Sequence, residues 1–460
     1  MKDPFVNRVR DLAALGKWWA SRDTFGLVWG RRRVGKSWLL ARFAEDHPAV
    51  LHTGGDRPLA QELGLFARAV DSAGLAGRRD LVERPFTSWD EALDSLSATA
   101  EARGHEVLVV LDEFPDLLRS DSSLETVLRA FGERSGRRSP LRILLCGSAV
   151  RVMQRIQEER SPLYGRFGLV LQLHPFEPHE AALMLPGLDP GERALVWGLL
   201  GGVPLYLSWW DQGATLEQNL AELVCQPGAR LLNEGRLVLA TEADMTALAG
   251  PVLSAIAAGR TKFNEVKDAV RTDPTRTLER LVELRLIERV APVTEDPRNS
   301  RRSRYRVADN FLVFWLGVVD RYRAEIDRGL GPTILPVLVQ SLDDHMGPRW
   351  EEAFRAHLRR LAVEGRLGPE VVAIGPWWRD GADEIDAVVL RGRGRQAVLA
   401  GEAKWAKRVT AGELEAALSG KAARIPGAAA DLGLALCARE EVVGAAPGTL
   451  TVTAEDIFAT

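Results

Sequence analysis

Residues 25–37 read Phe-Gly-Leu-Val-Trp-Gly-Arg-Arg-Arg-Val-Gly-Lys-Ser. An apolar run at residues 25–29 leads into a loop with glycine near both ends, and residues 38–43 continue with a helical apolar pattern. Glycines at these positions allow backbone N–H groups to converge at a helix N-terminus, where they can surround a phosphate group. The stretch therefore predicts an α/β fold in which a strand, a phosphate-binding loop and a helix follow one another.

The loop fits the pattern GxxxxGK[ST]. We expect the Lys36 ammonium to contact the terminal phosphates of a nucleotide, and the Ser37 hydroxyl to bind a magnesium ion. The sequence therefore predicts a site for a nucleoside triphosphate, taken to be ATP, together with Mg²⁺. The expected nucleotide-binding residues of this loop are Gly30, Arg31, Arg32, Arg33, Val34, Gly35, Lys36, Ser37 and Trp38.

Two further apolar runs alternate with helical patterns, which predicts a parallel sheet flanked by helices. The run at residues 107–111 ends in Asp112, expected to bind nucleotide-associated magnesium partly through water, and Glu113, expected to act as the general base. The run at residues 141–146 leads to Ser148. This serine would either contact the terminal phosphate at the crevice of the sheet or belong to a simple turn.

The composition is that of a globular protein with more than one domain, because 460 residues exceed what one core usually organises. A net charge of -3 gives no general attraction to polyanions, so a nucleic-acid surface would have to be local. The three cysteines form no CxxC pair, which fits a reducing cytoplasm. No apolar run is long enough to span a bilayer, so we expect no membrane contact.

Three segments follow the predicted sheet. Residues 177–239 have a helical pattern and predict a small lid, so residues 1–240 are expected to form one domain. Residues 245–325 combine helical patterns with two strand-like runs around an arginine-rich loop, which predicts a winged helix. Residues 340–460 begin with a helix and continue with strand-like runs, which predicts a small α/β domain.

On a winged helix, the third helix would face the major groove of DNA with Thr275, Arg276 and Arg280. The loop between the strands would contact phosphates with Arg298, Arg301, Arg302 and Arg304. Such domains also serve as spacers or protein interfaces, and nearby acidic residues dilute the positive charge. The sequence leaves both possibilities open.

The last segment carries a (D)…ExK pattern. Glu402 and Lys404 point to one face of a strand, and Asp386 on the neighbouring strand can meet them there. With Glu351 from the upstream helix, Asp386 and Glu402 would hold magnesium for phosphodiester hydrolysis, and Lys404 would stabilise the developing negative charge. ExK triplets also arise by chance, and a fold does not guarantee its chemistry. The sequence therefore leaves three alternatives: the domain cleaves DNA, only binds DNA, or binds another partner.

The motifs in this order resemble the archaeal-type ATPase family, which is related to AAA+ and STAND ATPases. The resemblance covers nearly the whole chain. It rests on FVNR from Phe5, GRRRVGKS from Gly30, LDEFPDLL from Leu111, CGSAVRVM from Cys146, SPLYGR from Ser161 and GGVP from Gly201. It implies a P-loop NTPase with a helical lid, a winged helix and a C-terminal restriction-endonuclease-like (PD-(D/E)XK) domain. It also implies that Arg166 reaches a terminal phosphate in its own or a neighbouring subunit, the latter in a homo-oligomer. The family often has Glu after the arginine of its N-terminal motif, whereas Val9 follows Arg8 here.

The sequence thus predicts an ATPase whose nucleotide state controls DNA contact and metal-dependent DNA cleavage. The alternative is a nucleotide-dependent signalling switch whose C-terminal domains bind protein partners without nuclease activity.

Overall fold

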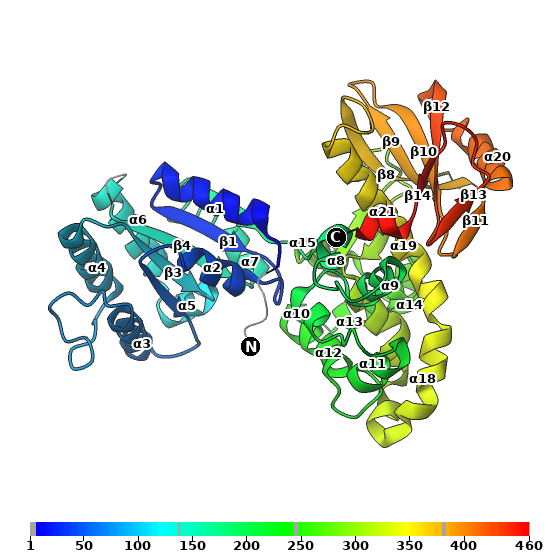
Figure 1. The fold of residues 1–460 in the computed structure, drawn as a ribbon. Coiled ribbons are helices and arrows are strands. Elements are labelled where there is room, and N and C mark those ends of the chain that lie inside the picture. The colour runs from blue at the N-terminus through cyan, green and yellow to red at the C-terminus, as the bar shows by residue number, and fades with distance from the viewer. Residues whose placement is uncertain (1–5, 137–138, 243–246, 380–382, 460) are drawn as a thin grey trace. The chain divides into compact units, whose positions relative to one another are not determined.

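The computed structural model describes residues 6–136, 139–242, 247–379 and 383–459 (Figure 1). The chain forms two compact units, Met1–Pro175 and Phe176–Thr460. Phe5 of the N-terminal motif and the expected domain start at residue 245 lie outside the described residues. In the described ranges, no helix combines the length and the apolar character needed to cross a membrane.

A parallel sheet with strand order β2-β3-β4-β1-β5 forms the centre of the first unit. Strands β1, β3 and β4 are buried over their whole length, as expected for continuous apolar runs between two helical layers. Because all five strands run the same way, the loops that follow β1, β3 and β4 meet at one edge. The strands are β1 (Phe25–Trp29), β2 (Ala49–Thr53), β3 (Val107–Asp112), β4 (Leu141–Gly147) and β5 (Phe167–Gln172).

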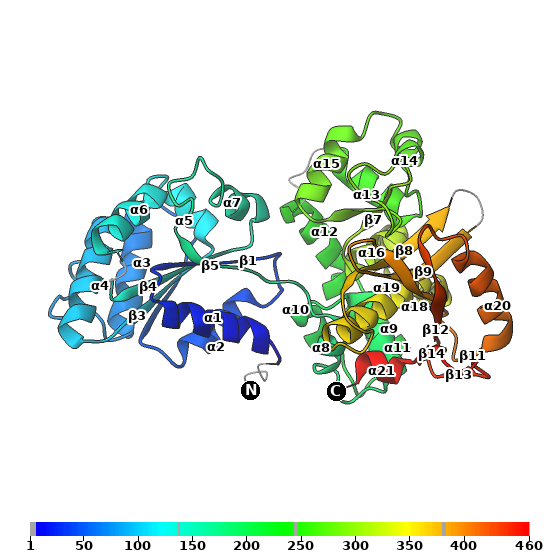
Figure 2. The same cartoon turned by 90° about the horizontal axis from the view of Figure 1, so that it is seen from above.

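Helices cover both faces of this sheet. Strand residues such as Val28 and Leu144 pack with α1 and α2, whereas their neighbours Leu27 and Leu145 pack with α3 to α6. Figure 2 shows α1 and α2 on one side of the sheet and α5 and α6 on the other. The helices are α1 (Val9–Ser21), α2 (Lys36–Ala44), α3 (Leu59–Ser72), α4 (Trp89–Arg103), α5 (Phe114–Ser120), α6 (Leu124–Ser135) and α7 (Val150–Arg155).

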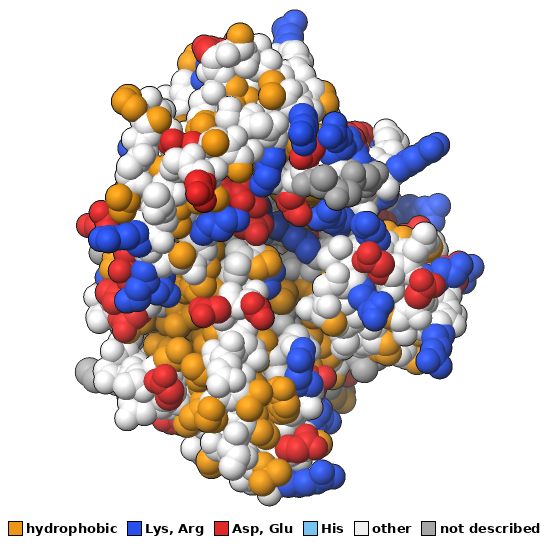
Figure 3. All heavy atoms as spheres, turned by 90° about the vertical axis from the view of Figure 1, so that its right-hand side faces the viewer, with side chains coloured by type: hydrophobic (Ala, Val, Ile, Leu, Met, Phe, Trp, Pro, Cys, Tyr) orange, Lys and Arg blue, Asp and Glu red, His pale blue; other side chains and the backbone are white. Residues whose placement is uncertain are grey.

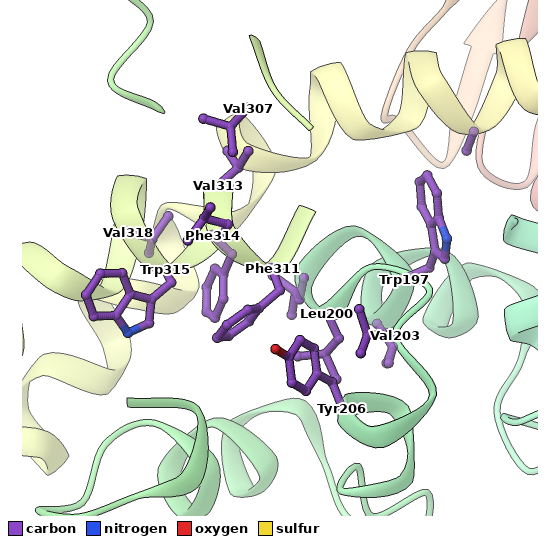
Figure 4. Close-up of a cluster of buried hydrophobic side chains, with 14 of the residues drawn as sticks. Trp197, Leu200, Val203, Tyr206, Val307, Phe311, Val313, Phe314, Trp315 and Val318 are labelled. Atoms are coloured by element: carbon purple, nitrogen blue, oxygen red, sulfur yellow. The ribbon is translucent and has the colours of Figure 1, made fainter. Parts of the chain in front are cut away.

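The helices expected to form a lid share the core of the second unit. Tyr206 packs on Phe311 with ring centroids 4.7 Å apart, and Trp315 donates its indole N–H to the Leu232 carbonyl. Figure 4 shows Leu200 and Tyr206 beside Phe311. The boundary between the two compact units thus falls after Pro175, whereas the sequence predicted one domain at residues 1–240. The reason is that the apolar sides of these short helices pack on later parts of the chain. They are α8 (Pro178–Ala182), α9 (Pro190–Leu200), α10 (Pro204–Ser208), α11 (Leu216–Leu223) and α12 (Arg230–Glu242).

Three helices and an antiparallel hairpin follow. Leu253, Val266, Leu278 and Leu281 are buried among them. The carboxylate of Asp273 accepts hydrogen bonds from the amide and hydroxyl of Thr275, the first residue of the third helix. The elements are α13 (Ala249–Ala257), α14 (Phe263–Val270), α15 (Thr275–Glu283), β6 (Ile287–Val290) and β7 (Arg304–Val307).

A run of helical segments then leads to the last sheet. It comprises α16 (Asn310–Phe314), η2 (Trp315–Val319), η3 (Asp320–Tyr322), α17 (Arg323–Glu325), η4 (Ile326–Leu330), α18 (Gly331–Gln340) and α19 (Leu342–Val363). The longest of them, α19, covers one face of the sheet with Trp350, Phe354 and Leu358.

The last sheet has the strand order β14-β12-β10-β9-β8. Strands β8, β9 and β10 are antiparallel neighbours, whereas β12 runs parallel to β10 and β14 runs parallel to β12. Helix α20 connects β10 to β12 and packs on the face opposite α19 through Leu418 and Ala422. The elements are β8 (Val371–Arg379), β9 (Asp383–Arg391), β10 (Gln396–Ala403), β11 (Arg408–Thr410), α20 (Ala411–Ala422), β12 (Ala428–Cys437), β13 (Glu441–Val443), β14 (Leu450–Val452) and α21 (Ala454–Phe458).

Candidate functional site

The loop after β1 is stabilised by its own lysine. Lys36 Nζ donates to the carbonyl oxygens of Gly30 and Arg31, each at 2.9 Å. Lys36 is buried, and these two acceptors compensate for the water that its ammonium has lost. Gly35 has φ 91°, a left-handed conformation that favours glycine, and α2 begins directly after it. The ammonium is therefore fixed at the loop, as a phosphate-binding lysine requires.

Ser37 and Asp112 come together from different elements. The Ser37 hydroxyl donates to Asp112 Oδ2 at 2.6 Å, and Asp112 Oδ1 accepts from the Glu113 amide at 2.9 Å. A serine hydroxyl beside a carboxylate is the oxygen pair that binds nucleotide-associated magnesium in P-loop proteins. The residues present thus fit Mg²⁺ at the position predicted for it.

Glu113 is held by Ser148. The hydroxyl of Ser148 donates to the carboxylate oxygens of Glu113 at 3.0 and 3.1 Å. This contact is possible because β4, which ends before Ser148, lies next to β3, which ends before Glu113. Glu113 has φ 48°, and left-handed residues other than glycine are uncommon and concentrate at functional sites. The sequence left open a phosphate contact or a turn for Ser148; the structure adds a role in orienting the carboxylate.

A buried thiol lies beneath this edge of the sheet. Cys146, on β4, is fully buried and lies beside the Asp112 carboxylate. Burial, and then the neighbouring Asp112 carboxylate, hold the pKa of the Cys146 thiol well above its ordinary value. The thiol is therefore neutral, and it supports the side chain of Asp112.

Arg8 ties the loop to the strand beside it. Its guanidinium donates to the carbonyl oxygen of Val34 at 2.7 Å and to that of His174, just after β5, at 2.9 Å. The family's acidic residue after this arginine is absent, and Val9 is exposed. Asp11 lies 3.4 Å from the Arg8 guanidinium and supplies a carboxylate from the first turn of α1 instead.

A cluster of carboxylates and lysines lies in the second unit. Lys404 Nζ donates to Glu402 Oε1 at 2.7 Å, and Lys421 of α20 lies 3.4 Å from Glu402 Oε2. Asp386 Oδ2 accepts from the Ala403 amide at 2.8 Å, so β9 and β10 bring both carboxylates together. Asp386 and Glu402 are buried.

Glu351 of α19 lines the same cleft, which has a volume of about 830 Å³. Burial, and then the Asp386 charge, raise the pKa of Glu351 to about 7. Burial, and then the Glu402 charge, raise the pKa of Asp386 to about 6. Crowded carboxylates of this kind favour binding of a cation or a proton.

The predicted metal ligands are gathered but not at coordination distance. Over the described residues, no group of three or more histidine, cysteine, aspartate or glutamate side chains is spaced to hold a metal ion. Glu402 is instead paired with Lys404 and Lys421. Metal binding by Glu351, Asp386 and Glu402 therefore stays a prediction.

Two arginines expected to contact DNA phosphates contact the protein itself. Arg302 donates to the Trp378 carbonyl and the Trp378 indole donates to the Arg302 carbonyl, while Arg304 pairs with Glu384 at 2.9 Å and lies over the Trp378 ring. The hairpin loop is thus attached to β8 and β9, a long-range contact that local sequence does not reveal. Arg298 and Arg301 are exposed, as are Thr275 and Arg276 of α15, whereas Arg280 is half-buried.

The tryptophans near this cleft are packing residues. Trp377 and Trp378 are buried. Trp405 packs edge-on against Trp350, with ring centroids 5.4 Å apart, and Arg439 lies over its ring. Their contacts are those of side chains that pack within the protein.

Two families match different parts of the chain. Residues 5–209 match a family described as an ATPase domain predominantly from Archaea. The chain carries an archaeal-type ATPase domain. Residues 315–417 match a family described as Archaea bacterial proteins of unknown function, and this range includes Glu351, Asp386, Glu402 and Lys404. The ATPase match supports nucleotide binding and ATP hydrolysis.

Relatives extend over most of the chain. An uncharacterized protein of Methanocaldococcus jannaschii is 23% identical over 411 residues, with 87% of each chain covered. The Walker-type ATPase of Pyrococcus abyssi has a TM-score of 0.52 at 20% identity, covering 68% of this chain and 96% of that one. The ORC2 protein of Aeropyrum pernix, solved in ADPNP–ADP complexes, has a TM-score of 0.48 at 16% identity, covering 71% of this chain and 96% of that one. The Pyrococcus structure supports the P-loop ATPase fold.

Arg166 is not brought to the phosphate-binding loop of its own ATPase domain. It precedes β5, which pairs in parallel with β1, so it lies at the amino end of the sheet, opposite the edge that carries Lys36. Arg166 pairs there with Glu133 of α6 at 2.6 Å. The expected contact within the same subunit is therefore not made, and a role toward a neighbouring subunit stays a prediction.

The remaining loop residues differ in exposure. Val34 is buried, whereas Arg32 and Trp38 are exposed, and Arg31 and Arg33 lie between these extremes. Their contacts with nucleotide stay predictions. The orienting roles of Ser148 and Arg8 were missed because each depends on a contact between segments far apart in the sequence.

Proposed function

We propose that the first unit hydrolyses ATP with Lys36, Ser37, Asp112 and Glu113, and that its nucleotide state controls nucleic-acid contact and cleavage by the second unit. The observation that supports the ATPase chemistry most directly is the meeting of the Ser37–Asp112 and Glu113–Ser148 pairs at one edge of the sheet. There Ser37 and Asp112 would hold a magnesium ion, which supplies charge neutralisation for the phosphates.

The hydrolytic step uses Glu113 as the base. The oxygen of a water attacks the γ-phosphorus of ATP and its proton passes to the Glu113 carboxylate. The bond from the γ-phosphorus to the bridging oxygen breaks, and its electron pair leaves with ADP. Lys36, fixed by two carbonyls, stabilises the negative charge on the phosphate oxygens. Ser148 orients the carboxylate without itself exchanging a proton.

We assign a restriction-endonuclease-like fold to the C-terminal part of the second unit. Its support is the order α19, three antiparallel strands, α20 and the parallel strand β12. Asp386 lies on the second of these strands, Glu402 on the third and Lys404 just beyond it. Glu351, Asp386 and Glu402 would hold a magnesium ion that makes hydroxide available, and Lys404 would stabilise the charge on the phosphodiester.

The helices α13 to α15 and the hairpin β6–β7 are proposed to act as a winged helix. The residues available to DNA are Thr275 and Arg276 on α15 and Arg298 and Arg301 in the hairpin loop, which are exposed. Phosphate contacts by these arginines would position the duplex, since two other loop arginines already contact the protein.

Cleavage is tested with the full chain, ATP, Mg²⁺ and labelled single- or double-stranded DNA. Wild type should cleave, and Lys404→Ala should lose the cleavage. Lys407→Ala is the matched control, because Lys407 is 70% exposed and pairs only with Glu440 on the described surface. Equal activity in wild type and Lys404→Ala would contradict a nuclease role for this cleft.

The alternative function is a nucleotide-dependent switch that binds protein partners. It is favoured by the pairing of Glu402 with two lysines and by the use of Arg302 and Arg304 inside the unit. If wild type neither binds nor cleaves nucleic acid at low salt, where phosphate contacts are strongest, the switch replaces the nuclease.

A further inference from the structure

An arginine in the cleft of the second unit lacks a counter-charge. Arg349, on α19, lines the cleft two residues before Glu351. Within the described part of the chain, its guanidinium makes no hydrogen bond or ion pair. Glu351 and Glu352 stabilise its charge from a distance, but a partly buried guanidinium without a direct acceptor is still costly, because it has lost water. The cleft therefore presents a cation that an anionic ligand would stabilise.

The neighbouring arginines are already neutralised. Arg306 pairs with Glu288 and Glu352, at 2.7 and 2.6 Å, and Arg355 pairs with Glu352 at 3.1 Å. Burial, and then the charge of Arg306, lower the pKa of Arg349 to about 10. These contacts set Arg349 apart: the carboxylates of α19 compensate the arginines around it and leave its own charge available to a ligand.

The other side chains that line the cleft also suit a nucleic-acid strand, because basic residues outnumber acidic ones among them. Seven arginine and lysine side chains line it against five carboxylates, although the whole chain is negative. Apolar side chains, Ile256, Val290 and Val313, line it as well and can contact bases. Figure 3 looks toward this unit and shows acidic and basic side chains interleaved around a hollow in its surface. A positively charged groove that follows the backbone is one of the usual means of holding single strands.

The size of the cleft suits single-stranded rather than double-stranded nucleic acid. A volume of about 830 Å³ lies in the range of small-ligand clefts, about 300–1,000 Å³. A cleft of this size accepts a short stretch of single strand, whereas the two paired strands of a duplex need more room than a small-ligand cleft provides.

We propose that this cleft binds single-stranded nucleic acid, and that Arg349 holds the phosphate next to the one that faces Glu351, Asp386 and Glu402. The proposal rests on the nucleic-acid function proposed above and names its substrate form and a positioning residue. Arg349 would act by placing the strand, while the carboxylates and Lys404 act on the scissile phosphate.

The test measures binding without cleavage. A fluorescent single-stranded 10-mer is titrated with the full chain in EDTA, and anisotropy gives the dissociation constant. Arg349→Gln should weaken binding at least about tenfold and lower the slope of log Kd against log salt by about 1, and Arg349→Lys should restore part of the affinity. Arg366→Gln is the matched control, because Arg366 is 66% exposed and lies outside the cleft. Its binding should equal that of wild type.

A melting curve separates binding from a structural role. Removing an uncompensated charge should leave the Tm of Arg349→Gln equal to or above that of wild type. A clear fall in Tm, or unchanged oligonucleotide affinity in Arg349→Gln, overturns the proposal. So does a loss of duplex affinity in Arg349→Gln as large as its loss of single-strand affinity, or a mononucleotide such as dAMP that competes with the 10-mer at equal concentration.

Cleavage assays with Mg²⁺ distinguish the two proposals. If Asp386→Asn loses cleavage while Arg349→Gln binds as wild type does, the nuclease function stands and the role of Arg349 fails. If Arg349→Gln loses binding although wild type cleaves nothing, the single-strand site stands and the nuclease function fails.

Discussion

The Ser148 hydroxyl donates to both carboxylate oxygens of Glu113, at 3.0 and 3.1 Å, across the ends of two adjacent strands. A hydrogen bond to a charged group contributes about 1.5–3 kcal/mol, and about 1.4 kcal/mol corresponds to a factor of ten in rate. Ser148→Ala should therefore lower the kcat of ATP hydrolysis about tenfold or more and leave the nucleotide Kd unchanged. Steady-state kinetics and calorimetry check this, and Ser148→Thr should recover much of the rate. A Kd that rises in step with the loss of kcat would instead place Ser148 in nucleotide binding.

Lys36 and Glu113 should separate binding from turnover. Lys36→Ala removes the charge at the loop and should abolish nucleotide binding in calorimetry. Glu113→Gln keeps the size of the side chain but cannot accept the proton of water, so it should slow hydrolysis and spare binding. Equal loss of binding in both variants would contradict these roles.

Arg8 should stabilise both the first unit and its nucleotide complex. Arg8→Gln removes the contacts to the Val34 and His174 carbonyls, and leaving buried acceptors unpaired costs about 1–3 kcal/mol. We expect a lower urea midpoint and a higher ATP Kd. Arg10→Gln changes an exposed arginine in the first turn of α1, which begins directly after Arg8, and serves as control. If both variants behaved alike, the connection through Arg8 would have no energetic importance.

Acid should destabilise the second unit through His345. Its Nε2 donates to the Gly198 carbonyl at 2.9 Å, and burial lowers its pKa from 6.5 to about 4. Between these values the unfolded chain binds more protons than the folded one, so stability is complete above pH 6.5 and falls as the pH drops toward 4. At pH 5 the loss is about 2 kcal/mol.

The measurement compares urea unfolding at pH 7 and pH 5. The difference between the two pH values should shrink in His345→Gln and persist in His105→Gln, which alters an exposed histidine. An undiminished pH dependence in His345→Gln would assign the acid sensitivity to other groups.

The first sheet was largely predictable, because its central strands are continuous apolar runs that end in recognisable motifs. Residues 25–29, 107–111 and 141–146 all lie in buried strands. Strands β2 and β5 were not predicted, since they are short and lie at the sheet edges, where buried and exposed positions alternate.

The site was predictable only where one segment carries the chemistry. The residues of the phosphate-binding loop and the Asp112–Glu113 pair follow from adjacent sequence. The Ser148–Glu113 contact follows from β4 being inserted beside β3, and the position of Arg166 at the opposite edge follows from the parallel pairing of β5. Packing of the hairpin loop on Trp378 is a tertiary contact, so no local pattern indicated that Arg302 and Arg304 would be used there.

The buried thiols provide a built-in reporter of local opening. Cys146 lies in the first unit, and Cys225 and Cys437 lie in the second; all three are free and buried. A disulfide-forming dye can modify each of them only when the surrounding structure transiently opens, so labelling rates measure the free energy of those openings. Because Cys146 supports Asp112, nucleotide should protect it selectively, and the ratio of its rate to the other two would follow occupancy of the first unit without any added tag.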